Sequence, residues 1–255
     1  MTERSRADVF GEVAPLYDRA RPTYPAEAID LIVGAVDAPR RAVEAGAGTG
    51  KATQLLAARG VEVLAVEPDA RMVEVLAETT RGLPVTIVNT PFEDAELPTG
   101  FDLGVAAQAW HWVEPERGAA QMAHAIRPGG ALALMWNTSG ANDSPLWKEI
   151  HATYDIHAPH MADSVLNKRP AADERSRTPL LEPGRFARPE KTIVPWVRRY
   201  STAEYADLLH THSDHRLLAP DVLDRLVEAI TAIIEDNGGS VDYAYETDAW
   251  LLERV

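Results

Sequence analysis

A glycine-rich run lies between a short apolar stretch and a helical pattern in this chain of 255 residues, and it reads Val43-Glu44-Ala45-Gly46-Ala47-Gly48-Thr49-Gly50. Glycines at a strand-to-helix turn let the backbone approach a ligand closely, because they carry no Cβ. Glu67 ends the next apolar run, 21 residues after Gly46. A carboxylate at that place can accept hydrogen bonds from both hydroxyls of a ribose. These residues predict a site for a ligand that carries adenosine.

Two other nucleotide-binding patterns fit this run less well. A phosphate-binding P-loop needs Gly at position 45 and Ser or Thr after the lysine, but the chain has Ala45, and Ala52 follows Lys51. The dinucleotide pattern G-x-G-x-x-G needs Gly at position 51, where Lys51 stands. A purely structural turn between a strand and a helix is the remaining alternative.

The elements around this run alternate between strands and helices, as the spacing of apolar residues indicates. Short connections between them predict an α/β fold with a doubly wound parallel sheet. The expected strands are residues 41–45, 61–67, 84–89, 101–106, 131–136 and 192–199, with a final strand within 241–255. The expected helices are residues 4–20, 26–36, 51–58, 69–80, 115–126, 145–154, 201–209 and 220–235. A turn is expected at 127–130, and a loop or lid at 157–185.

The pattern Glu-x-Gly-x-Gly-x-Gly, from Glu44 to Gly50, resembles the first motif of class I S-adenosylmethionine-dependent methyltransferases. The chain is similar to the methyltransferase-11 type, which includes trans-aconitate methyltransferase-like enzymes. The resemblance covers residues 8–137 and continues more weakly through 190–255. It implies a single domain over residues 1–255 with a Rossmann-like, seven-stranded sheet whose last strand is antiparallel. N-terminal helices at 1–36 would cover the cofactor, and 138–190 would form an inserted helical cap.

The resemblance also implies roles for residues along the cofactor, S-adenosylmethionine. The glycine loop passes under the methionine part, Glu67 holds the ribose, and Arg21 pairs with the cofactor carboxylate. Phe92 packs on the adenine, and Glu93, preferred over Asp94 and Glu96, accepts from its amine. Core packing is the alternative for Met72 and Phe92, and helix packing for Tyr17. The predicted cofactor-binding residues are Tyr17, Arg21, Glu44, Gly46, Ala47, Gly48, Gly50, Glu67, Pro68, Met72, Phe92, Glu93, Gln108 and Ala109.

A polar and aromatic cluster, Gln108-Ala109-Trp110-His111-Trp112, directly follows the strand expected at 101–106. Ligands of open α/β sheets bind outside the carboxyl ends of the strands. The cluster resembles a His-Trp pair in a branch of small-molecule methyltransferases. It suggests Trp110, Trp112 and Asn137 as substrate-binding residues and His111 as a base or as a residue that orients the acceptor. The alternative is that one tryptophan belongs to the core and His111 is a structural histidine.

Composition limits the partners that we expect. The net charge of −14 disfavours nucleic acid as a partner, although residues 168–199 hold nine Lys or Arg against four acids. This basic segment is either a solvated loop or a cationic patch that attracts an anionic acceptor. No apolar run is long enough for a membrane span, and no signal-peptide core is present, so we expect a cytoplasmic protein. The chain has no cysteine.

No metal site is expected from the sequence, because the histidines that stand close together have irregular spacing. These are His151, His157, His160, His210, His212 and His215. The favoured hypothesis is direct in-line methyl transfer from S-adenosylmethionine to a small molecule, with a carboxylate or hydroxyl acceptor and S-adenosylhomocysteine as the product. The alternatives are an NAD(P)-dependent oxidoreductase and a regulatory protein that binds the cofactor without catalysis. The acceptor and the oligomeric state are not predicted.

Overall fold

The computed structural model describes residues 14–161 and 177–255, and its chain divides into two compact units. The first, here called the sheet unit, comprises Thr23–Asn137, Pro170–Val194 and Thr247–Val255. The second, here called the helical unit, comprises Met1–Pro22, Thr138–Arg169 and Pro195–Glu246. Each unit has a hydrophobic core of its own.

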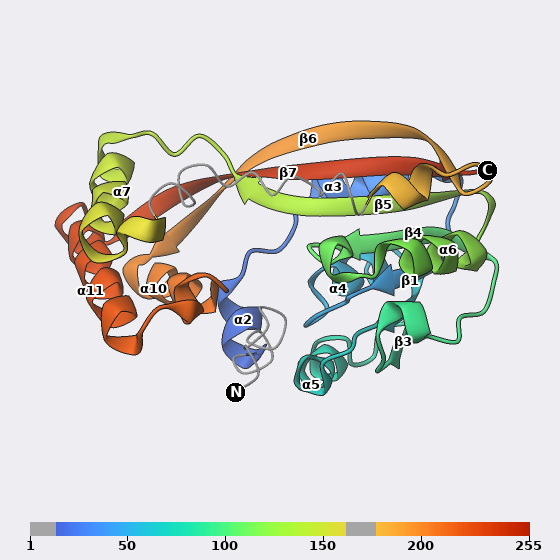
Figure 1. The fold of residues 1–255 in the computed structure, drawn as a ribbon, viewed down its shortest axis with the longest axis horizontal. Coiled ribbons are helices and arrows are strands. Elements are labelled where there is room, and N and C mark those ends of the chain that lie inside the picture. The colour runs from blue at the N-terminus through green and yellow to red at the C-terminus, as the bar shows by residue number, and fades with distance from the viewer. Residues whose placement is uncertain (1–13, 162–176) are drawn as a thin grey trace. The chain divides into compact units, whose positions relative to one another are not determined.

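Seven strands form one sheet in the order β3-β2-β1-β4-β5-β7-β6 (Figure 1). Strand β1 pairs in parallel with both β2 and β4, so the order of the strands reverses between β1 and β4. Ligands of doubly wound sheets bind beside the carboxyl ends of the strands at such a reversal. The strands are β1 (Arg41–Ala45), β2 (Glu62–Val66), β3 (Val85–Val88), β4 (Phe101–Ala107), β5 (Ile126–Ser139), β6 (Phe186–Ser201) and β7 (Ser240–Arg254).

The last strand runs antiparallel to its neighbours, as predicted (Figure 1). Thr247 of β7 donates a hydrogen bond to Asn137 near the end of β5. Farther along β7, the backbone N–H of Val255 donates to the carbonyl of Arg185, just before β6 begins. The seven-stranded, doubly wound fold predicted from the sequence is therefore confirmed.

Helices cover both faces of the sheet and bury alternate residues of its strands, as the period of two in a strand requires. On one face, Val43 of β1 packs in a cluster with α6 (Pro115–Ala125) and the short helices η1 (Phe92–Asp94), η2 (Trp110–Trp112) and η3 (Thr178–Leu181). On the other face, Ala42 packs with α3 (Ala26–Val33), α4 (Lys51–Ala57) and α5 (Ala70–Thr79). Strands buried on both faces explain the short apolar runs of the sequence.

The helical unit packs an amphipathic helix, α11 (Pro220–Asp236), against α7 (Pro145–His157) and α10 (Thr202–Thr211) (Figure 1). Helix α2 (Ala14–Ala20) contacts α10, and the short helix η4 (His215–Leu217) contacts α10 and α11. Ile230 and Ile234 of α11 are fully buried, one turn apart on the same face. Ser201 and Glu204 form the capping box predicted at the start of α10.

The start of β5 differs from the prediction of a turn at 127–130. The strand begins at Ile126, and its register with β4 shifts between Phe101 and Leu103. Asp102 lies at this irregularity and accepts hydrogen bonds from the Arg127 side chain at 2.8 Å and from the backbone of Arg40 and Arg41. The dipeptide Pro128-Gly129 therefore belongs to an irregular strand, which tertiary contacts stabilise and local sequence does not reveal.

The boundaries of the two units differ from the single domain with a cap at 138–190 that the sequence suggests. Leu180 and Phe186 pack in the core of the sheet unit, whereas α7 and residues 195–246 belong to the helical unit. The predicted N-terminal element, 1–36, is divided between the units, and its first thirteen residues lie outside the described part, as does 162–176 of the predicted lid. Within 14–161 and 177–255, no helix has the length and apolar character needed to cross a bilayer.

Candidate functional site

The glycine loop connects β1 to α4 and requires glycine at three places. Gly46, Gly48 and Gly50 have φ values of 68°, 58° and 91°, in the left-handed region that other residues rarely adopt. A Cβ on Gly46 would lie 2.5 Å from the Cβ of Ala109, whereas a Cβ on Gly48 would meet no atom within 4 Å. Gly46 is therefore required for packing against the segment after β4. Gly48 leaves open space beside the loop for a ligand.

Glu67 connects this loop to the end of β2. Its carboxylate accepts hydrogen bonds from the backbone N–H of Gly48 at 2.8 Å and of Asp69 at 3.0 Å. Burial raises the pKa of Glu67, while these two hydrogen bonds act in the opposite direction. Two oxygens have about four acceptor positions, so acceptor capacity remains for hydroxyl donors.

The side chain of Glu44 is buried beneath the glycine loop. It is 1% exposed, and its Oε2 accepts a hydrogen bond from the hydroxyl of Thr53 in α4 at 2.6 Å. Burial, with a further contribution from the charge of Glu67, raises the pKa of Glu44 to about 7. Its predicted place in cofactor binding remains a prediction, because the observed partner of its carboxylate is Thr53.

The residues after β2 and β3 surround the Glu67 backbone. Asn89 donates from its side-chain amide to the carbonyls of Glu67 at 2.8 Å and Pro68 at 3.0 Å. Pro68 is exposed and Met72 is buried. Neither Asn89 nor Thr53 was predicted from the sequence. The sequence feature that could have identified them is a polar side chain just after β3, for Asn89, and in the first turn of α4, for Thr53.

The predicted adenine contacts lie in η1 and differ in exposure. Phe92 is buried and packs edge-on against Trp110, with ring centroids 6.3 Å apart. Asp94 forms an ion pair with Arg117, whereas Glu93 is partly exposed and accepts from Arg117 only through its backbone carbonyl. Since Asp94 is engaged in this ion pair, the structure is consistent with the preference for Glu93. Phe92 lies in the core, which was the alternative to its predicted packing on the adenine.

The Trp-His-Trp segment forms η2, and its side chains have three different surroundings. Trp110 is fully buried in the core, which differs from its predicted role in binding substrate. Trp112 is 46% exposed. His111 is exposed and accepts a long hydrogen bond, 3.4 Å, at Nδ1 from the indole N–H of Trp136, a residue that sequence reasoning missed. Only His111 and Trp112 of this segment offer exposed side chains.

The residues that flank η2 connect it to the sheet. Gln108 has a positive φ of 59° and donates from its side chain to the carbonyl of Asn137 at 3.0 Å. The Asn137 amide donates to the carbonyl of Thr23 and accepts from the hydroxyl of Thr247. These contacts show that Asn137 stabilises the sheet unit, and its contact with substrate remains a prediction.

The remaining predicted residues, Tyr17 and Arg21, belong to the helical unit. Arg21 donates to the carbonyl of Thr211 at 2.9 Å, and its guanidinium carbon lies 5.3 Å from the centroid of the Tyr17 ring. Their role toward the cofactor remains a prediction.

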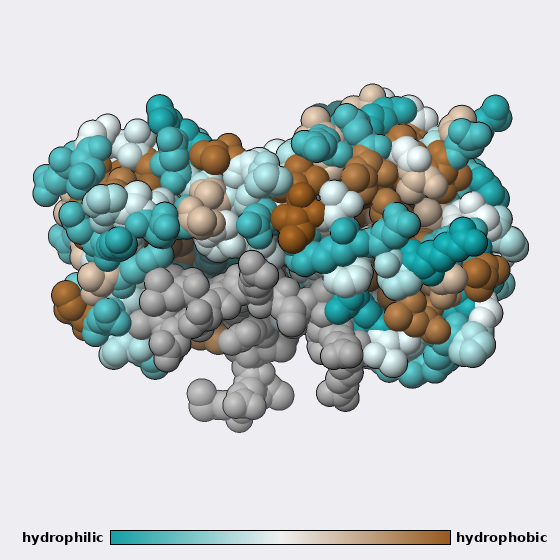
Figure 2. Space-filling view, turned by 90° about the horizontal axis from the view of Figure 1, so that it is seen from above, coloured by the Kyte–Doolittle hydropathy of each residue, from teal (hydrophilic) through white to brown (hydrophobic). Residues whose placement is uncertain are grey.

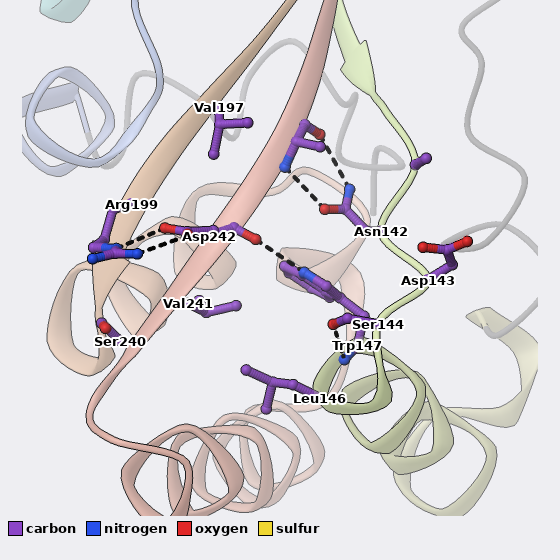
Figure 3. Close-up of a pocket in the computed structure, with 12 residues that line it drawn as sticks. Asn142, Asp143, Ser144, Leu146, Trp147, Val197, Arg199, Ser240, Val241 and Asp242 are labelled. Atoms are coloured by element: carbon purple, nitrogen blue, oxygen red, sulfur yellow. Dashed lines mark hydrogen bonds and ion pairs between the residues drawn. The ribbon is translucent and has the colours of Figure 1, made fainter.

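A pocket of about 430 Å³ in the helical unit contains none of the predicted site residues (Figure 3). Its polar groups bind one another: Arg199 pairs with Asp242, the indole N–H of Trp147 donates to the Asp242 carbonyl, and Asn142 bonds to the backbone of Ala244. Leu146, Val197 and Val241 supply its apolar lining. The glycine loop and its carboxylates therefore remain the candidate site, and we assign no function to this pocket.

The described part of the basic segment is largely neutralised by neighbouring acids. Arg185 pairs with Glu116, Arg188 with Glu253, and Lys191 with Asp248. On the face drawn in Figure 2, hydrophilic residues are interspersed with hydrophobic groups. These pairs favour a solvated surface over a cationic patch.

We expect the Glu44→Gln variant to be more stable than the wild type at pH 8. The unfolded chain releases the Glu44 proton near pH 4.5 and the folded chain near pH 7. The folded state therefore binds more protons between these values, and stability falls as the pH rises. The expected difference is about 3 kcal/mol at pH 8 and vanishes below pH 4.5. Urea unfolding at both pH values measures it. The exposed Glu62→Gln serves as the control, and an equal response of both variants would contradict this account.

Comparison with known proteins supports the family that the glycine motif suggested. Residues 43–134 match a family model described as a methyltransferase domain. An uncharacterised methyltransferase of Mycobacterium tuberculosis is 44% identical over 140 residues, which cover 52% of this chain and 55% of the relative. The chain thus spans about half the length of this relative. An uncharacterised methyltransferase of Schizosaccharomyces pombe is 25% identical over 251 residues, covering 94% of both chains.

Solved structures with low sequence identity share the fold. A putative type II methyltransferase from Anaeromyxobacter dehalogenans has a TM-score of 0.65 and 22% identity, covering 91% of this chain and 97% of the other. A Haemonchus contortus phosphoethanolamine N-methyltransferase, solved with S-adenosylhomocysteine and phosphomonomethylethanolamine, has a TM-score of 0.52 and 14% identity, covering 99% of this chain and 58% of the other. Residues 43–134 are thus similar to a methyltransferase domain, and the solved structures show that the chain shares the fold of known methyltransferases.

Proposed function

We propose that this chain is an S-adenosylmethionine-dependent methyltransferase that acts on a small molecule. The observation that carries the proposal is the hydrogen bond from the Gly48 N–H to the Glu67 carboxylate, at the reversal of the strand order. It brings together a glycine-rich loop and a carboxylate that can accept hydrogen bonds from hydroxyls, which are the two features that an adenosine-bearing cofactor needs.

The loop fits this cofactor better than it fits a dinucleotide. The open space beside Gly48 gives a ligand access to the backbone, and Glu67 is positioned for the ribose. Lys51 stands where the dinucleotide pattern needs glycine, and this disfavours the oxidoreductase alternative. When bound, S-adenosylmethionine supplies an activated methyl group, which passes to the acceptor by in-line displacement and leaves S-adenosylhomocysteine.

A small acceptor is supported by two observations. The described basic residues 185, 188 and 191 are paired with acids, so nearby negative charge offsets theirs, and this disfavours a polyanion such as nucleic acid. The Haemonchus contortus neighbour binds phosphomonomethylethanolamine, a small molecule. Since the methyl donor is already activated, the chain mainly aligns the two reactants, an effect worth about 7–11 kcal/mol in favourable cases.

His111 is better suited to orient the acceptor than to remove a proton through Nε2. The indole N–H of Trp136 only donates, so Nδ1 of His111 is the accepting nitrogen of this pair. A neutral imidazole then carries its proton on Nε2. We therefore propose that Nε2–H donates to an oxygen of the acceptor, a role that suits a carboxylate, which needs no base.

Substitution of two loop glycines by alanine should separate packing from ligand access. Both variants carry the cost of left-handed backbone, about 1–2 kcal/mol. Gly46→Ala should lose additional stability, because its Cβ meets that of Ala109 at 2.5 Å. Gly48→Ala should instead weaken cofactor binding at least tenfold, because its Cβ enters the space beside the loop. Urea unfolding and calorimetry with S-adenosylhomocysteine measure the two effects, and a reversed order of stabilities would refute the packing argument.

Glu67→Ala should weaken binding of S-adenosylmethionine by at least ~30-fold, because the ribose loses its acceptor and the loop loses a hydrogen bond worth about 1.5–3 kcal/mol. The measurement is isothermal titration of S-adenosylmethionine into both proteins. Glu62→Ala, an exposed change on the same strand, is the matched control and should bind as the wild type does.

Titrations of the wild type with S-adenosylmethionine, with S-adenosylhomocysteine and with NAD decide among the proposed functions. Binding of NAD without binding of S-adenosylmethionine would sink the methyltransferase proposal. Binding of S-adenosylmethionine without transfer to any small acceptor would favour the regulatory alternative.

His111→Ala should lower kcat/KM about 10-fold and leave cofactor affinity unchanged, because one neutral hydrogen bond to the acceptor is lost. Loss of a general base would instead cost about 10²–10⁴-fold. The pH profile provides a second readout. If His111 orients the acceptor, we expect the wild type and the variant to show the same pH dependence of kcat/KM across the range in which imidazoles titrate. A rise in kcat/KM with pH that the wild type shows and the variant lacks would identify His111 as a base.

A further inference from the structure

Three side chains that bind metal ions in proteins come together in the helical unit, between α10 and α11. His212, Asp214 and His215 each offer a ligand atom, and these atoms all lie within 4.8 Å of one another. Two imidazoles and a carboxylate form a ligand set typical of Zn²⁺ and related first-row divalent ions. The sequence spacing alone did not predict this arrangement.

The distance within one pair of these ligands is close to that of a formed site. Oδ1 of Asp214 lies 3.1 Å from Nδ1 of His215. Ligand atoms about 2.0–2.1 Å from a tetrahedral zinc ion lie roughly 3.3–3.4 Å apart. The two atoms can therefore bind one ion after a shift of a few tenths of an ångström.

Tyr154 of α7 supplies the outer hydrogen bond that metal-binding histidines usually have. Its hydroxyl lies 2.9 Å from Nε2 of His215, and both side chains are buried. When the Tyr154 hydroxyl accepts Nε2–H, the lone pair of Nδ1 faces the Asp214 carboxylate and is available to a cation. In the other tautomer Nδ1–H donates to Oδ1 of Asp214, which also accepts from the backbone N–H of His215 at 3.0 Å.

His212 completes the set from the end of α10. Its ring lies 5.3 Å from that of His215, centroid to centroid, in an edge-on arrangement. His212 and Asp214 are partly exposed whereas His215 is buried. An ion can therefore enter from the His212 side, while His215 and Tyr154 anchor the site.

We propose that His212, Asp214 and His215 form a binding site for Zn²⁺ or a similar divalent ion, with Tyr154 as the residue that orients His215. The ion connects the segment between α10 and α11 to α7 and stabilises the helical unit. This site contains none of the glycine-loop residues and does not depend on methyl transfer.

The test is titration of Zn²⁺ into the full chain, purified without a histidine tag. We expect one ion per chain with a dissociation constant of about 1 μM or less, and a rise in Tm. His212→Ala should weaken binding at least tenfold. Tyr154→Phe, which keeps the buried ring, should weaken it about 10–100-fold, as the loss of an outer hydrogen bond to a ligand does. Co²⁺ absorption in the visible range reports the coordination geometry.

His210→Ala is the matched control, because His210 is a partly exposed histidine of the same segment outside the cluster. It should bind Zn²⁺ as the wild type does. The proposal is overturned if the wild type binds no Zn²⁺, since the cluster then holds only a proton between Asp214 and His215. It is also overturned if His210→Ala weakens binding as much as His212→Ala, or if His212→Ala and Tyr154→Phe both bind normally. Circular dichroism without metal verifies that each variant is folded.

Discussion

The hydrogen bond between the Gly48 N–H and the Glu67 carboxylate is the contact on which the rest of the candidate site depends. It joins the loop after β1 to the end of β2. Glycine suits the left-handed backbone of the loop, and the lack of a side chain at Gly48 leaves open space beside the loop. Asn89 holds the Glu67 backbone from the next strand. Three neighbouring strands thus position one carboxylate beside one turn.

This arrangement has a cost in stability. Glu44 and Glu67 are both almost fully buried, and the charge of Glu67 opposes ionisation of Glu44. Hydrogen bonds from Thr53 and from backbone N–H groups offset part of the desolvation. A buried acid at position 44 does not help the sheet to fold, since a neutral amide can make the same bond to Thr53.

The features that the sequence predicts well are those that depend on neighbouring residues. The N-cap Asp69, the capping box of Ser201 and Glu204 and the strand at 41–45 all occur where local patterns indicated. The irregular start of β5 and the division into two units depend on contacts distant in sequence, such as that between Asp102 and Arg127. Asn137 was assigned to substrate because a polar residue at a strand end fits a site. Its partners at positions 23 and 247 are more than one hundred residues away.

The Trp-His-Trp segment shows how local geometry can divide one motif among several tasks. A 3-10 helix has about three residues per turn, so three successive side chains point about 120° apart. In η2 this directs Trp110 into the core, places His111 beside the indole of Trp136 and leaves Trp112 exposed. Trp110 therefore anchors the turn, and its burial fixes the direction of the other two. Because the exposed side chains of this segment are those of His111 and Trp112, these are the two that a ligand could contact without a change in the core.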